Sequence, residues 1–297
     1  MQNAIGNHRI PIIKTSLSSL TGIGFFFCIF LLFFIVVTYV CTFLMAKMTN
    51  ETASLRIATL LQDIFIFILP AVVTALMMTR LPARFLFIDN VPQLWSTILA
   101  IATLFVAMPW MNVLIEWNES FTFPESMKEI GESLRATEDA AAEFVKKMLK
   151  GSSIGSLLVS VCIIGILAGL SEELFFRGTL LRLFFQTRMN PHIAIWSVAV
   201  IFSLMHFQFF GFIPRLVLGA YFGYLVYWTR NLWIPIIVHA INNSTVVVTQ
   251  WYEANSGKEV LDPTSHEAIN WVYFSISILF TIGCIYLLIQ QNKSQNA

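Results

Sequence analysis

Long stretches without charged residues dominate this sequence. Intervals of at least 21 residues without Lys, Arg, Asp or Glu separate Lys14 from Lys47, Asp89 from Glu116, Lys150 from Glu172, Arg188 from Arg215, Arg230 from Glu253, and Glu267 from Lys293. Because about 20 apolar residues cross the hydrocarbon core of a bilayer as a helix, each interval is long enough to span it. Two further stretches are apolar except for one charged residue each: the one between Arg56 and Arg80 contains Asp63, and residues 212–228 contain Arg215.

This pattern predicts an all-α, polytopic membrane bundle of about eight transmembrane helices. The predicted helices cover residues 20–46, 55–79, 92–115, 154–185, 192–210, 212–229, 232–251 and 269–290. The first span is too long for a secretory h-region and no small-residue cleavage site follows it, so we expect it to be retained. The helices form one membrane domain in three parts: an N-terminal part (1–153), a core (154–252), and a last loop and span (253–297).

The N-terminal part ends in a hydrophilic segment that predicts an amphipathic helix over residues 125–150. Its apolar positions recur at three-, four- and seven-residue steps, which places them on one stripe of a helix. The stripe consists of Met127, Ile130, Leu134, Ala141, Phe144 and Met148. We expect this helix to lie at the membrane surface or over the bundle. It acts there as a connector or as a lid.

Composition and charge narrow the functional classes. Hydrophobic residues make up 57% and charged residues only 12% of the chain, against about 25% charged in soluble domains, so a water-soluble particle is excluded. A net charge of +1 gives no basic excess to neutralise phosphates, so we expect no nucleic-acid partner. The four cysteines lie in apolar spans without CxxC spacing, which argues against a disulfide framework or a zinc knot.

Basic residues in the short loops predict the orientation. If eight helices cross the membrane in alternating directions, most cations in the loops fall on one side of the membrane. These are Arg9, Lys14, Arg80, Arg84, Arg182, Arg188, Arg230 and Lys293. The opposite side has Lys47, Arg56, Arg215 and Lys258. Positive loops stay in the cytoplasm, so both termini should be cytoplasmic. The compact, short-looped chain suggests a bacterial inner membrane.

Polar groups inside the predicted spans are the candidates for function, because the membrane makes them costly. The fourth span contains Glu172, Glu173 and Arg177. Glu173 and Arg177 are four residues apart and share a helical face, which predicts a structural ion pair. Glu172 lies about 100° around the helix and lacks that partner. Glu172 is therefore the candidate base.

Two later spans add His206, His239 and Asn243. His239 and Asn243 are four residues apart, so both side chains leave the same face of a helix. A carboxylate, two imidazoles and an amide suit the activation of water for hydrolysis, with Glu172 as base and His239 and Asn243 as oxyanion donors. The same Glu172, His206 and His239 could instead bind zinc, although HExxH is absent. The sequence leaves both chemistries open.

The three motifs, Glu-Glu-x-x-x-Arg, Phe-x-x-x-His and His-x-x-x-Asn in this order on hydrophobic segments, resemble those of the CPBP family of CAAX proteases and bacteriocin-processing enzymes, also called Abi. The resemblance covers about residues 154–252. It implies an eight-helix intramembrane endopeptidase that acts on a membrane-associated peptide or protein, with lipid as the surrounding partner. Substrate and oligomeric state stay open.

The resemblance also implies roles for the motif residues. Glu172 resembles the catalytic carboxylate, Glu173 and Arg177 its structural neighbours, and His206 the histidine of the second motif. His239 with Asn243 resembles the oxyanion pair. Family members are described both as metalloproteases and as glutamate-dependent peptidases, and we favour the metal-free mechanism without a cofactor. The alternatives are a proton-coupled transporter and a non-catalytic membrane immunity or binding protein.

Asp63 in the second span lies outside these motifs. A carboxyl group inside a membrane helix needs a hydrogen-bond partner. We expect Asp63 to be either a hydrogen-bonded structural residue or a group that contacts the catalytic side chains without contacting the substrate.

Overall fold

The computed structural model describes residues 14–257 and 271–293, and within these ranges all regular secondary structure is helical. This confirms the all-α class. Two cations of the orientation argument, Arg9 and Lys258, lie outside the described residues. The first helices are α1 (Ser19–Lys47), α2 (Glu51–Leu61), η1 (Gln62–Ile68), α3 (Leu69–Met78), α4 (Pro82–Phe85), α5 (Leu94–Val106) and α6 (Met108–Glu119).

The remaining helices carry the predicted core and its flanks. They are η2 (Glu125–Met127), α7 (Lys128–Met148), α8 (Ile154–Ser160), η3 (Val161–Leu167), α9 (Ala168–Glu173), η4 (Leu174–Leu180), α10 (Leu181–Gln186), α11 (Pro191–Leu204), α12 (Phe212–Thr229), α13 (Trp233–Ser256) and α14 (Trp271–Lys293). Of the helices in the described ranges, η1, η3 and η4 are π-helical. They interrupt α-helices without ending them, so α2 to α3 and α8 to α10 each run as one continuous rod.

Several helices have the length and composition of transmembrane spans. Among the described residues, four helices are long and apolar enough on their own, and a bent pair adds a fifth if its two halves form one span. They are Ser19–Lys47, Glu51–Met78, Ile154–Gln186 and Trp271–Lys293, and the pair is Leu94–Val106 with Met108–Glu119. The chain is thus a membrane protein with several transmembrane helices. α11 has 14 residues, fewer than the roughly 20 that cross a bilayer upright. The total of eight spans stays a prediction.

Two predicted helix boundaries are wrong. The single helix predicted over 92–115 is broken at Ala107, where α5 and α6 meet at 48°. Pro109 is the second residue of α6, and its ring, which lacks an N–H, cannot continue the hydrogen bonding of α5. The helix predicted over 192–210 ends at Leu204, so His206 lies in the turn that follows it and not within a span.

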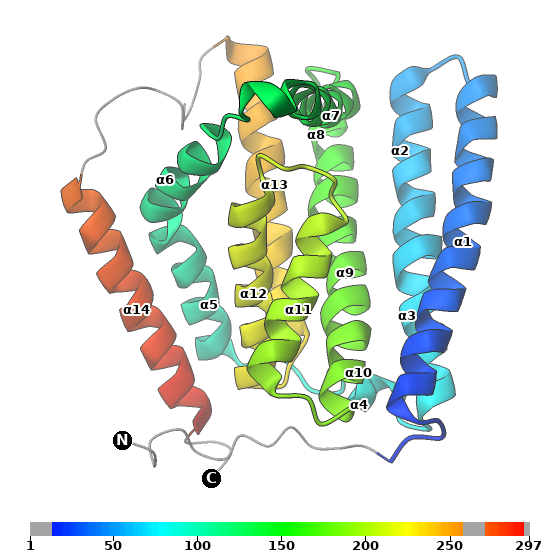
Figure 1. Ribbon diagram of the computed structural model, residues 1–297, viewed down its shortest axis with the longest axis vertical. Helices are drawn as coiled ribbons and strands as arrows, with labels where there is room; N and C mark the ends of the chain where they lie inside the picture. Colours follow the sequence, from blue (N-terminus) through cyan, green and yellow to red (C-terminus); the bar gives the residue numbers. More distant parts are fainter. Residues whose placement is uncertain (1–13, 258–270, 294–297) are drawn as a thin grey trace.

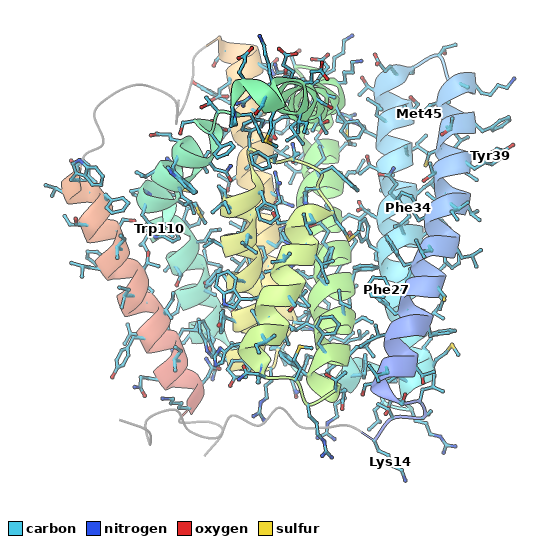
Figure 2. All side chains as sticks on the ribbon, in the orientation of Figure 1. Lys14, Phe27, Phe34, Tyr39, Met45 and Trp110 are labelled. Atoms are coloured by element: carbon cyan, nitrogen blue, oxygen red, sulfur yellow. The ribbon has the colours of Figure 1, made fainter. Side chains whose placement is uncertain are left out.

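The helices form a bundle in which the predicted core lies at the centre (Figure 1). α1 and the α2–α3 rod stand at one side, and α14 stands at the other beside α5 and α6. The rod that contains α9, together with α11, α12 and α13, lies between them. α1 carries exposed apolar side chains such as Tyr39 and Phe34 (Figure 2), as expected for a helix in contact with lipid.

The amphipathic segment forms α7, which lies across one end of the bundle (Figure 1). Its C-terminal end is fastened to α2: Lys147 pairs with Glu51 at 2.8 Å, and Arg56 donates to the Met148 carbonyl at 2.8 Å. The hydrogen bond to Glu51 raises the pKa of Lys147. Ile130 and Phe144 on the apolar stripe are 52% and 39% exposed. The stripe therefore faces outward for much of its length.

Glycines allow α13 to approach the central rod closely. A Cβ at Gly169 would lie 3.0 Å from the backbone nitrogen of Ala240, and one at Gly165 would collide with Ser244 Oγ. The two glycines are four residues apart, the small-xxx-small spacing that lets membrane helices pack backbone to backbone. This approach brings His239 on α13 against α9.

We expect Gly169→Ala to destabilise the fold. The obstructing atom belongs to the backbone of α13, so the helices must separate, which costs roughly 1–3 kcal/mol for an overpacked site. The measurement is denaturant unfolding of the purified protein in detergent micelles. Gly283→Ala in α14 is the matched control, because no atom lies within 4 Å of its added Cβ. Equal stability of the two variants would contradict this packing argument.

Candidate active site

The two adjacent glutamates lie at the end of α9, between two π-helical segments. Glu173 is fully buried, whereas the side chain of Glu172 is 18% exposed. Glu173 Oε1 accepts a hydrogen bond from Arg177 Nη1 at 2.6 Å, and both side chains are 0% exposed. The ion pair expected from the four-residue spacing is therefore present. Each charge neutralises the other in an interior where neither could stand alone.

Arg177 is held by α12 and α11 as well as by Glu173. Its Nη2 donates to the Gly219 carbonyl at 2.9 Å. Its guanidinium lies 4.4 Å from the centre of the Phe202 ring, which is within the range of a cation–π contact. A Cβ at Gly219 would lie 3.3 Å from Arg177 Nη2. The cation thus joins three helices of the central region.

His239 also bonds to Glu173, a contact that helical spacing alone does not predict. His239 Nδ1 lies 2.8 Å from Glu173 Oε1, and the residue is 3% exposed. An ionised carboxylate can only accept hydrogen bonds, so Nδ1 is the donor. This fixes the ring and leaves Nε2 for other chemistry. The ring also stacks on Phe222, with 4.7 Å between centroids and 27° between planes.

Glu172 faces the free edge of that histidine. Its Oε2 lies 3.7 Å from His239 Nε2, beyond hydrogen-bonding distance. This oxygen is buried and has no hydrogen-bond partner among the residues described. Glu172 is therefore close to the imidazole but not hydrogen-bonded to it. Of the two glutamates, it is the one whose side chain is partly open to a substrate or a water.

His206 lies in the turn after α11, which corrects its predicted place inside a helix. Phe207 has a left-handed backbone, with φ of 54°, and this ends the helical path. His206 Nδ1 lies 2.8 Å from the Phe202 carbonyl oxygen and must donate to it, since a carbonyl only accepts. The imidazole also packs edge-on against the Phe202 ring at 4.9 Å.

The turn that carries His206 is tied down from a distant part of the chain. Asn118 at the end of α6 donates to the Phe209 carbonyl at 3.2 Å and accepts from the Ile213 N–H at 2.8 Å. Glu138 on α7 accepts from the Phe210 N–H at 3.2 Å. α6 and α7 therefore help to place a residue of the second motif. Sequence reasoning missed Asn118, and its position at a helix end gave no signal.

Asn243 is bound away from His239 in this structure. Its Nδ2 donates to the Ile164 carbonyl at 3.4 Å, and its Oδ1 accepts from Asn242 at 3.2 Å. The four-residue spacing places Asn243 on the helical face of His239, but its amide nitrogen bonds to η3. Its expected role as an oxyanion donor stays a prediction.

Asp63 reaches the central rod from η1. Its Oδ1 accepts from Ser171 Oγ at 3.0 Å. Ser171 directly precedes Glu172, so this hydrogen bond connects the second span with the segment that carries the two glutamates.

The zinc alternative requires Glu172, His206 and His239 to converge on one ion. Within residues 14–257 and 271–293, no group of three or more His, Cys, Asp and Glu side chains is placed to hold a metal ion. The zinc alternative and the metal-free mechanism both stay predictions.

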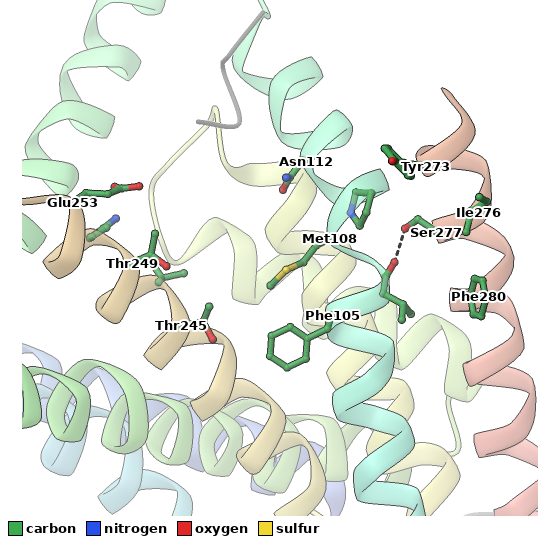
Figure 3. Close-up of a pocket in the computed structure, with 14 residues that line it drawn as sticks. Phe105, Met108, Asn112, Thr245, Thr249, Glu253, Tyr273, Ile276, Ser277 and Phe280 are labelled. Atoms are coloured by element: carbon green, nitrogen blue, oxygen red, sulfur yellow. Dashed lines mark hydrogen bonds between the residues drawn. The ribbon is translucent and has the colours of Figure 1, made fainter. Parts of the chain in front are cut away.

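A separate pocket of about 830 Å³ lies farther along α13 (Figure 3). It is lined by α13, α14 and the bend between α5 and α6, and Phe105, Met108 and Phe280 contribute apolar surface. Its lining includes Thr245 and Thr249 but none of the six candidate residues, which are Glu172, Glu173, Arg177, His206, His239 and Asn243. The pocket and the candidate site are thus distinct features of the bundle.

The part of the chain that holds the candidate site is similar to a known protein family. Residues 154–245 match the family model described as type II CAAX prenyl endopeptidase Rce1-like. The chain contains an Rce1-like segment. This confirms the family resemblance of the motifs, and the segment includes all six candidate residues. It runs from α8 into α13.

A curated relative is similar over a short stretch only. An uncharacterized protein, YpbD of Bacillus subtilis (strain 168), is 30% identical over 80 residues, which are 26% of this chain and 38% of that protein. The chain thus spans well under half the length of this curated relative. No solved structure matches the chain.

We expect Arg177→Ala to be strongly destabilising. Loss of the guanidinium leaves Glu173 as a buried, uncompensated charge, which costs about 3–5 kcal/mol in comparable pairs. Denaturant unfolding in detergent measures the effect. Lys128→Ala is the control, because it breaks the exposed Lys128–Glu125 pair, and such pairs contribute about 0–1 kcal/mol. Similar losses in both variants would refute a structural role for the buried pair.

Proposed function

We propose that the protein is an intramembrane endopeptidase that cleaves a membrane-associated peptide or protein. The observation that carries the proposal is Glu172 Oε2, a buried oxygen without a partner among the described residues, 3.7 Å from His239 Nε2. The Rce1-like segment supports a proteolytic function of the CAAX type. Glu173 is already bound to Arg177 and His239. We therefore assign the exchange of a proton with water to Glu172.

In the proposed reaction Glu172 takes a proton from water, and the resulting hydroxide oxygen attacks the carbonyl carbon of the peptide bond. The carbonyl oxygen becomes negatively charged in the tetrahedral intermediate. The C–N bond then breaks, and the proton held by Glu172 passes to the leaving nitrogen. Water is thereby divided between a new carboxyl and a new amino group.

His239 is the proposed donor to the oxyanion. Its Nδ1 proton is engaged by Glu173, so donation from Nε2 requires a doubly protonated ring. The adjacent Glu173 carboxylate stabilises that cation, much as a buried carboxylate stabilises an imidazolium in other hydrolases. His206, whose Nδ1 is held by Phe202, is the proposed group that orients the attacking water through Nε2. Asn243 is proposed to assist His239.

We propose lipid and a membrane-associated polypeptide as the partners. The name of the matching family points to a prenylated C-terminal CAAX peptide as one substrate to test. The proposed location is a bacterial inner membrane with both ends cytoplasmic. Transport and non-catalytic binding are the competing functions, and neither of them produces new polypeptide ends.

We expect Glu172→Gln to abolish cleavage without unfolding the protein. Loss of a general base lowers rates by about 10²- to 10⁴-fold, while the glutamine keeps the size of the side chain. New protein termini are compared by mass spectrometry in membranes from cells that express either form. Synthetic peptides that contain the sites found are then tested with purified protein in detergent.

The control for this experiment is Glu129→Gln on the exposed face of α7, which should cleave like the wild type. If termini produced by the wild-type protein also appear with Glu172→Gln, the catalytic assignment is wrong. If the wild-type protein produces none, the endopeptidase proposal itself fails.

We also expect cleavage to persist after treatment with EDTA, because the proposed steps use protein side chains alone. The rate of peptide cleavage is measured before and after exhaustive dialysis against the chelator. Activity that disappears with EDTA and returns with zinc would reject the metal-free mechanism.

A further inference from the structure

Asp63 is a buried carboxyl group that the proposed reaction does not use. It is 4% exposed, and its Oδ2 has no hydrogen-bond partner among the residues that the structure describes. Its Oδ1 accepts from Ser171 Oγ at 3.0 Å, across 108 positions of sequence. Ser171 itself is 0% exposed. This hydrogen bond therefore joins two membrane rods in the interior of the bundle.

A simple tie between helices does not need a carboxyl group. An interhelical hydrogen bond in a membrane contributes only modest stability, whereas an Asp near the centre of a membrane helix strongly opposes insertion. Serine or asparagine could accept the same hydroxyl proton with a smaller penalty. The presence of Asp63 at this position therefore points to a functional role.

The partner of Asp63 is next to the candidate base. Ser171 directly precedes Glu172 in α9, so the hydrogen bond from Asp63 ends one residue before the candidate base. The Ser171 hydroxyl also lies 3.0 Å from the Ala168 carbonyl of its own helix. Without Asp63, the hydroxyl would have only the Ala168 carbonyl as an acceptor. α9 would then lose its hydrogen bond to the rod that contains η1.

The local backbone is irregular on both sides of this contact. Asp63 lies in the π-helical η1, which packs against α9, and α9 lies between the π-helical η3 and η4. π-helical segments are rare and are frequent at functional sites. Asp63 therefore lies within one π-helical segment, and two others flank the short helix that carries Ser171 and Glu172.

We propose that Asp63 is a positioning residue of the site, which holds Ser171 and so fixes the turn of α9 from which Glu172 projects toward His239. This inference rests on the proposed endopeptidase function. Asp63 acts through the acceptor oxygen that it offers to Ser171, and it does not touch the substrate.

The test uses full-length variants in cells and measures how fast the termini that depend on Glu172 form. We expect Asp63→Ala and Ser171→Ala each to slow their formation by about 10- to 100-fold, since small displacements of catalytic groups cost this much. Asp63→Asn retains an acceptor and should restore most of the rate. The double variant should be no slower than the slower single variant, because both remove one interaction.

Ser96→Ala is the matched control, because it breaks a buried contact between α5 and α14, the one to Asn292, away from the site. It should leave the rate unchanged. A wild-type rate in Asp63→Ala, additive losses in the double variant, or no rescue by Asp63→Asn would each overturn the inference. If one of these outcomes is found while Glu172→Gln still abolishes cleavage in the same cells, the role of Asp63 is rejected but the proposed function is not.

Discussion

One carboxylate oxygen, Oε1 of Glu173, holds the candidate site together. It accepts hydrogen bonds from both Arg177 and His239, and all three side chains are nearly inaccessible to solvent. A charge in this interior must be compensated. The cation that compensates Glu173 is itself anchored to the carbonyl of Gly219. The position of the imidazole therefore depends on an electrostatic balance that involves α9, η4, α12 and α13.

Phe202 has a comparable part in the aromatic surroundings of the site. Its ring lies against the Arg177 guanidinium and against His206, while its carbonyl oxygen fixes His206 Nδ1. This explains why a phenylalanine four residues before a histidine suits the second motif. The carbonyl contact needs only the backbone, but the contact with the cation needs an aromatic face.

Features that depend on local spacing could be predicted from the sequence. Charge-free intervals predict a helical membrane protein, and the four-residue spacing of Glu173 and Arg177 predicts their ion pair. Contacts between distant segments could not be predicted in this way. The bond between Glu173 and His239 spans 66 positions. The turn that carries His206 depends on Asn118, which belongs to another helix. The π-helical segments left no local signature, whereas Pro109 does mark the bend between α5 and α6.

The different surroundings of the two adjacent glutamates argue for a division of roles. Both lie on α9, yet one is fully buried with two donors on a single oxygen, and the other is partly exposed with a buried oxygen that lacks a partner among the described residues. The carboxylate of Glu173 already accepts from a guanidinium and an imidazole, so it holds Arg177 and His239 in place. The proposed mechanism therefore assigns proton transfer to Glu172, whose buried oxygen holds no other described residue in place.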